Sequence, residues 1–224
     1  DYVSGYEYPL KMHYHINISK QFDKGIDVKF PWEVSRFYFG VQFAKNYRIT
    51  KNDKYYTDYK SLILSWIEYN PYCIGVNWVC TMEVSIRAIN WIVSLNMFGE
   101  KFHKDLVFIK KLSISLQQHA EYISSFPEIY KLNGITHSGN HTTAGNAGLL
   151  FLSITLKNSE HSNSWIGIAI EGLESNIAYQ TYNDGVNFEA SIPYHRLVLE
   201  LFSYCAIVLK YNEKEFSSNY YRNL

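Results

Sequence analysis

The segment Trp78–Phe98 constrains the fold more than any other part of the sequence, because it is apolar on nearly every side. A helix of that composition is usually buried. The segment also carries one polar stripe at helical spacing, made of Glu83, Arg87, Asn90 and Ser94. Other helices have to cover such a segment on more than one side, so we expect it to be an inner helix of an all-helical domain.

Six further segments show helical patterns of apolar residues, separated by short polar breaks. They cover residues 32–47, 59–67, 104–126, 140–156, 164–182 and 193–214. Pro31 and Pro193 each suit a helix start, and Asn70-Pro71 suits a helix end. Residues 1–30 are irregular in pattern, and only residues 186–192 alternate in the manner of a strand. Consecutive helices with short connections favour antiparallel hairpins, which can wrap into a toroid.

The composition argues against several classes of protein. Hydrophobic residues make up 47 %, enough for a substantial core, and 21 basic residues balance 21 acidic ones. A formal charge of zero argues against bulk attraction to nucleic acid or to a membrane. No run of 18 apolar residues appears, so we expect no transmembrane helix. Cys73, Cys80 and Cys205 are odd in number and lack metal-binding spacing, so we expect buried thiols.

Tyr194 and His195 follow an extended polar segment and open an apolar helix. A tyrosine is a poor base at neutral pH, but positive neighbours or a helix N-terminus favour the phenolate. On an ideal helix His195 points about 100° away from Tyr194 and would line a different wall. Taken alone, the pair also fits a simpler interpretation, an aromatic residue at a helix start beside a solvated histidine.

Asn140 and His141 open another predicted helix, directly after Gly139. Asparagine is a favoured N-cap, so Asn140 can serve only to satisfy the first amides of that helix. Alternatively, its amide can bind a substrate carboxylate near the helix N-terminus. His137 and His141 are four residues apart, but no third ligand stands at a fixed spacing, so we expect no metal site and no cofactor.

Glu83 and Arg87, one helical turn apart on the predicted inner helix, have two interpretations. They can form a structural ion pair, or they can line the polar wall of a sugar-binding cleft. A glycosidase would need two carboxylates on either side of one bond, and Glu83 and Glu189 are the candidates for that reaction. An unsaturated product would exclude it.

Several segments together resemble the helical domain of the heparinase II/III-like polysaccharide lyases, a group that includes alginate and heparan lyases. The matching segments are DVKFPWEVSR (27–36), WIEYNP (66–71), GVNW (75–78) with Glu83 and Arg87, GNH (139–141), GLLFL (148–152) and DGVNFEAS (184–191) through Tyr194 and His195. They follow the family order over about residues 27–205. Residues 142–145 depart from the bulkier apolar residues of many relatives and leave the particular substrate open.

The resemblance implies an incomplete α/α toroid over residues 1–224 that carries half of an active-site cleft. The implied activity is cleavage of a uronic-acid polysaccharide by β-elimination. Tyr194 is then the catalytic acid/base, Asn140 neutralises the uronate carboxylate, and His141 assists there or at the neighbouring subsite. The implied substrate-binding residues are His195, Glu83, Arg87, Asn77, Trp78 and Glu189.

The resemblance also implies partners and a location. Relatives continue into a β-sandwich domain that supplies a further catalytic histidine, and we expect that domain to be absent from this chain. The chain alone should therefore be only weakly active. The implied partner is an acidic polysaccharide, and the implied location is periplasmic or secreted. The alternatives are a non-catalytic glycan-binding domain of the same fold and a helical scaffold that binds protein.

Overall fold

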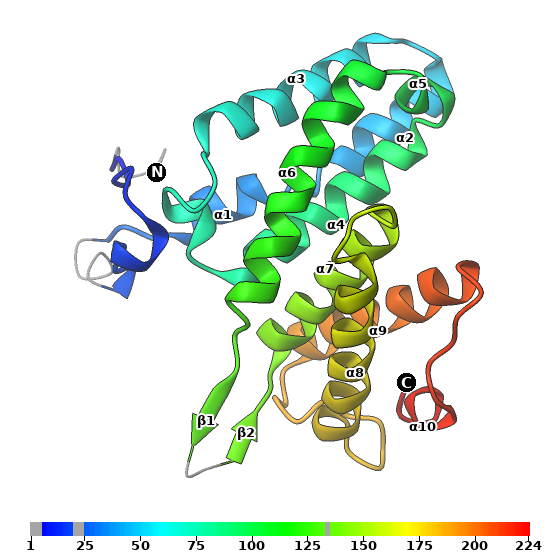
Figure 1. Cartoon of the computed structure of the whole chain (residues 1–224). Coiled ribbons are helices and arrows are strands. Elements are labelled where there is room, and N and C mark those ends of the chain that lie inside the picture. Colours follow the sequence, from blue (N-terminus) through cyan, green and yellow to red (C-terminus); the bar gives the residue numbers. More distant parts are fainter. Residues whose placement is uncertain (1–5, 20–24, 133–134) are drawn as a thin grey trace. The chain divides into compact units, whose positions relative to one another are not determined.

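The computed structural model describes residues 6–19, 25–132 and 135–224 and is mainly helical (Figure 1). It divides into two compact units, residues 1–119 (unit 1) and 120–224 (unit 2), and the division falls within helix α6 (Leu106–Ser125). The strands among the described residues are two short ones in unit 2, so the prediction of an all-α fold is confirmed. That residues 1–224 form one domain stays a prediction.

Unit 1 is built around the predicted inner helix, α4. The described elements before α6 are the 3-10 helices η1 (His13–His15) and η3 (Val76–Trp78) and the helices α1 (Lys29–Ser35), α2 (Gly40–Thr50), α3 (Lys54–Tyr69), α4 (Thr81–Met97) and α5 (Glu100–His103). Helix α4 packs against α1, α2, α5 and η3, and α3 packs against α2. Val84, Trp91 and Leu95 of α4 have no exposed surface, and the prediction that this helix is buried is confirmed.

The predicted single helix over residues 32–47 is wrong, because the chain breaks between α1 and α2. Phe37 adopts a left-handed backbone conformation (φ 58°), which ends α1 and packs its ring edge-on against Trp91, with 5.4 Å between ring centroids. Helix α2 then starts at Gly40, where a Cβ atom would lie only 2.2 Å from the hydroxyl of Tyr59. The break therefore depends on contacts with distant residues, which the helical spacing does not reveal.

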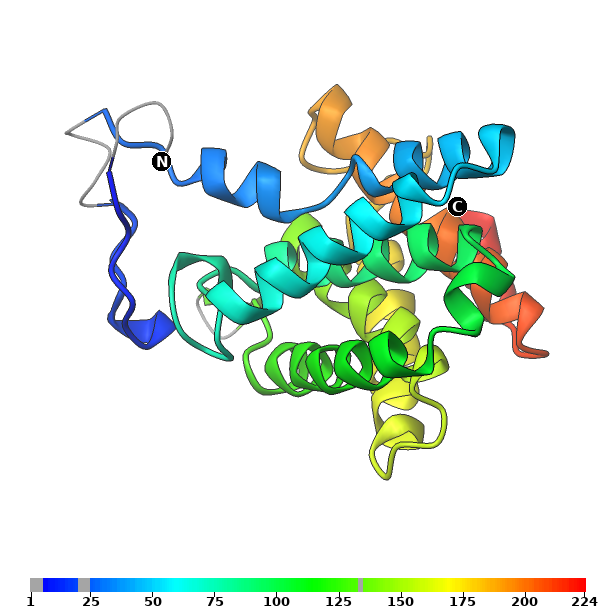
Figure 2. The same ribbon diagram turned by 90° about the horizontal axis from the view of Figure 1, so that it is seen from above.

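Unit 2 is built around α7. Its elements are β1 (Tyr130–Leu132), β2 (Ile135–His137), α7 (Asn140–Thr155), α8 (Ser162–Gln180), α9 (Ile192–Tyr211) and α10 (Ser218–Asn223). Helix α7 packs against α8 and α9, and Figures 1 and 2 show α7 and α8 side by side. A Cβ atom at Gly172 of α8 would lie 2.3 Å from Nδ2 of Asn146, so glycine permits this close approach. The predicted segments for α7, α8 and α9 match within three residues at each end.

The extended structure expected over residues 186–192 is absent, because residues 186–191 form a folded loop between α8 and α9 and Ile192 begins α9. Gly185 (φ 86°) and Ala190 (φ 50°) turn the chain, and a single bridge joins Thr181 to Asn187. The antiparallel pair β1 and β2, with Lys131 opposite Thr136, had no signal in the alternation of the sequence.

Two expectations concern the apolar residues of the chain. Among the described residues, α9 is the one helix that is long and apolar enough to cross a membrane by length and composition. It carries three charged residues and packs against α7, so the absence of a membrane span stays a prediction. The three cysteines are buried and outside any disulfide, as predicted.

Candidate functional site

The residues predicted to form the site fall in both units. Unit 2 holds Asn140, His141, Glu189, Tyr194 and His195. Unit 1 holds Asn77, Trp78, Glu83 and Arg87. All residues predicted to be catalytic therefore belong to one unit.

Glu189 binds the first residue of α7 with both oxygens of its carboxylate. Asn140 donates from its backbone N to Oε1 at 2.8 Å and from Nδ2 to Oε2 at 2.7 Å. Asn140 is 7 % exposed, and its Oδ1 is buried without a hydrogen-bond partner among the described residues. The N-cap of α7 is Gly139, so the interpretation of Asn140 as a side-chain cap is wrong. A carboxylate from 49 residues along the chain stabilises this helix start instead.

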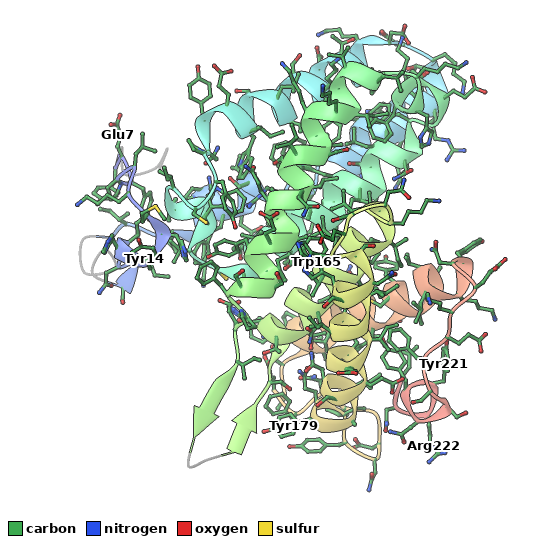
Figure 3. All side chains as sticks on the ribbon, in the orientation of Figure 1. Glu7, Tyr14, Trp165, Tyr179, Tyr221 and Arg222 are labelled. Carbon is green, nitrogen blue, oxygen red and sulfur yellow. The ribbon has the colours of Figure 1, made fainter. Side chains whose placement is uncertain are left out.

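The loop that carries Glu189 also contacts the first turn of α9. The Oδ1 of Asn187 accepts a hydrogen bond from the Glu189 N–H at 3.0 Å, and Asn187 donates from its own N to Nδ1 of His195 at 3.3 Å. Phe188 packs edge-on against Tyr179, which Figure 3 shows near the end of α8. Residues 187–189 thus connect the first turn of α7 to the first turn of α9.

Tyr194 lies in that first turn of α9, and its side chain is accessible. The residue is 49 % exposed and directly follows Pro193, which is placed at the helix start as predicted. The positive end of the helix dipole lies at this turn and favours negative charge there. Tyr194 is therefore the exposed member of the predicted catalytic set, while Asn140 is the buried one.

His141 takes a partner that the sequence did not indicate. Its Nδ1 lies 3.0 Å from Oε2 of Glu128, and Thr142 donates from Oγ1 to the backbone oxygen of Glu128 at 2.6 Å. Glu128 follows Pro127, where the spacing of the chain indicates only the end of a helix. A carboxylate beside an imidazole orients the ring. The side chain of His137 lies outside the described residues.

Gln180, at the end of α8, is a second residue that sequence reasoning missed. It is fully buried and donates from Nε2 to the backbone oxygen of Gly139 at 3.1 Å and to Oγ1 of Thr143 at 3.0 Å. These bonds hold the first turn of α7 in addition to those from Glu189. Gln180 has no motif around it, so only the folded arrangement reveals this role.

In unit 1, the spacing of Glu83 and Arg87 suggested an ion pair between them, and this is wrong. Both carboxylate oxygens of Glu83 bind Arg36, at 2.6 Å from Nε and 2.6 Å from Nη2. Glu83 is 1 % exposed, and this bidentate geometry suits a buried carboxylate. Burial alone would lower the pKa of Arg36, but the hydrogen bonds and charge of Glu83 hold it above its ordinary value.

Arg87 lies among aromatic rings. Its guanidinium is 4.0 Å from the ring centroid of Trp66 and 5.4 Å from that of Trp78, and its Nε donates to Nε2 of His119 at 3.0 Å. Arg87 has no exposed surface. Stacking and hydrogen bonding of this kind offset part of the cost of burying the charge.

Asn77 and Trp78 are buried against the end of α3. Asn77 donates from Nδ2 to Oδ1 of Asn70 at 2.7 Å, and Trp78 donates from Nε1 to the backbone oxygen of Asn70 at 3.2 Å. Trp78 is 1 % exposed and Asn77 is 9 % exposed. The structure thus gives the predicted substrate-binding residues of unit 1 partners inside that unit, and their contact with a substrate stays a prediction.

Solved structures share this fold. The chain is similar to the crystal structure of a heparan sulfate lyase mutant from Pedobacter heparinus, with a TM-score of 0.69, 25 % identity, and coverage of 88 % of this chain and 31 % of that one. It is also similar to the crystal structure of heparinase III, with a TM-score of 0.70, 20 % identity, and coverage of 85 % and 29 %. The chain therefore has the predicted fold class, an incomplete α/α toroid.

The sequence also shows which family the chain belongs to. Residues 2–224 match the family described as Heparinase II/III N-terminus, and the chain belongs to that family. It is 24 % identical over 196 residues to the heparin-sulfate lyase of Pedobacter heparinus, and 20 % identical over 188 residues to that of Bacteroides stercoris. These matches cover 84 % and 79 % of this chain. The chain spans 28 % of the length of both relatives.

Proposed function

We propose that this chain is the helical part of a polysaccharide lyase that cleaves a uronic-acid polymer by β-elimination. The observation that carries the proposal is the connection between two helix starts in unit 2. Asn140 begins α7, Tyr194 lies in the first turn of α9, and Glu189 and Asn187 connect the two turns. The names of the relatives, both heparin-sulfate lyases, support the same class of reaction.

The reaction requires a base at the carbon next to the uronate carboxylate. In the proposal the phenolate of Tyr194 takes the proton from that carbon, and the glycosidic oxygen leaves from the neighbouring carbon with a proton returned by the same hydroxyl. A carbon–carbon double bond forms as the carbon–oxygen bond breaks. The exposure of Tyr194 at a helix N-terminus supports this role, because a polymer can reach it. A positioned acid/base contributes about 10²–10⁴-fold.

The reaction also requires stabilisation of the negative charge that develops on the uronate carboxylate. As the proton leaves, charge spreads into the carboxylate oxygens, and donors placed there stabilise the transition state more than the ground state. Asn140 offers the N–H of its Nδ2 that does not bind Glu189, and His141 offers an imidazole kept in place by Glu128. We assign the neutralisation of the carboxylate to these two side chains. We assign His195, whose Nδ1 accepts a hydrogen bond from the Asn187 N–H, to substrate binding.

The direct experiment offers the full-length protein a panel of uronate polysaccharides, with heparan sulfate first, since the relatives are named for heparin-sulfate. Ultraviolet absorbance of unsaturated ends is the measurement. We expect absorbance to rise with at least one polymer. New reducing ends without that absorbance would indicate hydrolysis, and binding without any product would indicate a glycan-binding domain.

Two parts of the proposal concern the whole protein. We propose that a β-sandwich domain of the same polypeptide completes the cleft, since the relatives are more than three times as long as the matched region. We also propose a periplasmic or secreted location, where an extracellular polysaccharide would be met. Detection of the protein in the periplasmic or secreted fraction of its source cells would test the location.

A further inference from the structure

Glu189 accepts hydrogen bonds from both nitrogen atoms of Asn140 at once, which leaves the second N–H of Nδ2 for another acceptor. Its Oε1 accepts from the backbone N–H and its Oε2 from Nδ2, at 2.8 and 2.7 Å. The approach is close, since a Cβ atom at Gly139 would lie 3.0 Å from Oε1. No other hydrogen bond to the Asn140 amide exists among the described residues, because Oδ1 is buried without a partner. Glu189 is therefore the described residue that determines whether Nδ2 or Oδ1 of the Asn140 amide faces the carboxylate.

The loop holds this carboxylate in a costly conformation. Ala190, the next residue, has φ 50°, in the left-handed region that is unfavourable for a non-glycine residue. Two hydrogen bonds keep the turn closed, from Ala190 N to the backbone oxygen of Asn187 at 3.1 Å and from Glu189 N to Oδ1 of Asn187 at 3.0 Å. Strain of this kind persists where the surrounding contacts over-determine the conformation.

We propose that Glu189 is a positioning residue that fixes the direction of the Asn140 amide, and this inference rests on the proposed lyase function. A carboxylate only accepts hydrogen bonds, so it holds the amide with Nδ2 toward itself. The opposite orientation would place Oδ1 against a negative charge. The second N–H of Nδ2, which is to meet the uronate carboxylate, is then fixed before the substrate binds, and preorganised donors of this kind supply much of the stabilisation in such sites.

Replacement of Glu189 by glutamine separates this role from a purely structural one. The backbone N–H of Asn140 can only donate, so Oε1 of the new glutamine has to stay on it. Its Nε2 then stands where Oε2 stood and needs an acceptor, which the Asn140 amide can offer only by turning over. Glu189→Gln thus keeps two hydrogen bonds but puts the oxygen of Asn140 where its N–H donors were. An oxygen there repels a carboxylate.

Unit 2 supplies a matched control. Glu174 binds Ser217, at the start of α10, with the same geometry: Oε1 accepts from the backbone N at 2.6 Å and Oε2 from Oγ at 2.7 Å. Glu174 and Glu189 are both partly exposed. The hydroxyl of Ser217 accepts as readily as it donates, so Glu174→Gln keeps both bonds without reversing any group that takes part in the proposed reaction.

The experiment measures kcat, KM and melting temperature of the full-length wild type, Glu189→Gln and Glu174→Gln on the polymer that the wild type cleaves. We expect Glu189→Gln to lose at least about tenfold in kcat, toward the 10²–10³-fold seen when one oxyanion donor is removed. Its melting temperature should match that of Glu174→Gln, which should keep wild-type kcat. A kcat within twofold of wild type would overturn the inference. So would a lower KM at unchanged kcat, which would mean that Glu189 competes with the substrate carboxylate.

A second measurement distinguishes failure of the inference from failure of the proposed function. Glucuronate binding by calorimetry needs no turnover. If the wild type cleaves no polymer, the lyase proposal fails, but glucuronate binding that is lost in Glu189→Gln and kept in Glu174→Gln would still support the positioning role. Equal binding by wild type and Glu189→Gln, or no binding by either in an inactive protein, would overturn it.

Discussion

Arg87 donates a hydrogen bond from Nε to Nε2 of His119 at 3.0 Å, and neither side chain has any exposed surface. Since Nε2 accepts from Arg87, the proton of the neutral imidazole lies on Nδ1, which is 2.6 Å from the backbone oxygen of Ser115. Trp78 and Trp91 cover the ring, with centroids 4.9 and 5.3 Å away. Burial and then the charge of Arg87 lower the pKa of His119 well below its ordinary value.

This contact predicts a loss of stability on acidification. The pKa of His119 is lowered in the folded state, so between that value and about 6.5 the unfolded chain takes up a proton that the folded chain does not. The contribution of neutral His119 to the free energy of unfolding is then fully present above about pH 7 and is lost as pH drops below 6.5. From pH 7.5 to 5, protonation of His119 in the unfolded chain can lower the free energy of unfolding by at most about 2 kcal/mol.

The measurement is urea unfolding at both pH values, followed by tryptophan fluorescence, for wild type and His119→Gln. The glutamine oxygen can accept from Arg87 but does not titrate. The free energy of unfolding of His119→Gln should change less between the two pH values than that of wild type, by up to about 2 kcal/mol. An equal pH dependence in both proteins would contradict the assignment of His119 as a buried neutral residue.

Glu83 and Arg36 should be energetically coupled, because both oxygens of the carboxylate bind the guanidinium. Glu83→Gln leaves Arg36 without its buried counter-charge and should lower the free energy of unfolding by about 3 kcal/mol. A double-mutant cycle with Arg36→Met measures the coupling. The same cycle with Arg87→Met is the comparison, and we expect a smaller coupling there. A larger coupling between Glu83 and Arg87 would restore the ion pair that their spacing suggested.

The helices of this chain are predictable from sequence where a local pattern of apolar residues coincides with a residue that suits a helix start. The starts of α7, α8 and α9 follow from apolar spacing together with Gly139 and Pro193, and the observed bounds agree. The break at Phe37 was not predictable, because the residues on both sides continue a helical pattern. Its cause is an aromatic contact with Trp91, which lies 54 residues further along the chain. Periodicity reports which side of a helix is buried but carries no information about such partners.

The candidate site shows the same limit. Motif order identified Asn140, Tyr194 and Glu189 as residues of interest, and the structure places all three in unit 2. Their hydrogen-bond partners could not be predicted, since Asn140 and Glu189 are 49 residues apart and Gln180 has no motif. A favoured N-cap residue type suggested that Asn140 caps its own helix. The side chain of Asn140 instead donates to Glu189, and the same carboxylate accepts the backbone N–H of Asn140.

Asn140→Ala should lower turnover far more than stability. The substitution removes the bond from Nδ2 to Glu189 but keeps the one from the backbone N, so about 1–2 kcal/mol of stability should be lost. Ser217→Ala is the matched control, because it removes the corresponding side-chain bond to Glu174 and also a bond from Tyr220 N. Thermal melts and kcat of both variants are the measurements. Asn140→Ala with normal turnover and a reduced melting temperature would show a structural residue only.

Tyr194→Phe should abolish elimination and leave the fold intact. The hydroxyl belongs to a residue that is 49 % exposed, so its removal leaves no buried group without a partner and should change stability by less than about 0.5 kcal/mol. Turnover should fall at least about 10²-fold, because the same oxygen takes the proton from carbon and returns one to the leaving oxygen.

Tyr204→Phe controls for the loss of an exposed hydroxyl on the same helix. Tyr204 is 52 % exposed and lies almost three turns further along α9, outside the proposed site. The two variants should therefore have the same melting temperature and differ only in kcat, which is measured from the absorbance of unsaturated ends. If Tyr194→Phe retains more than about a tenth of wild-type turnover, the role of acid/base has to be assigned to another group, since a positioned acid/base contributes at least about 10²-fold. His195, one residue along the same turn, would then be the first to test.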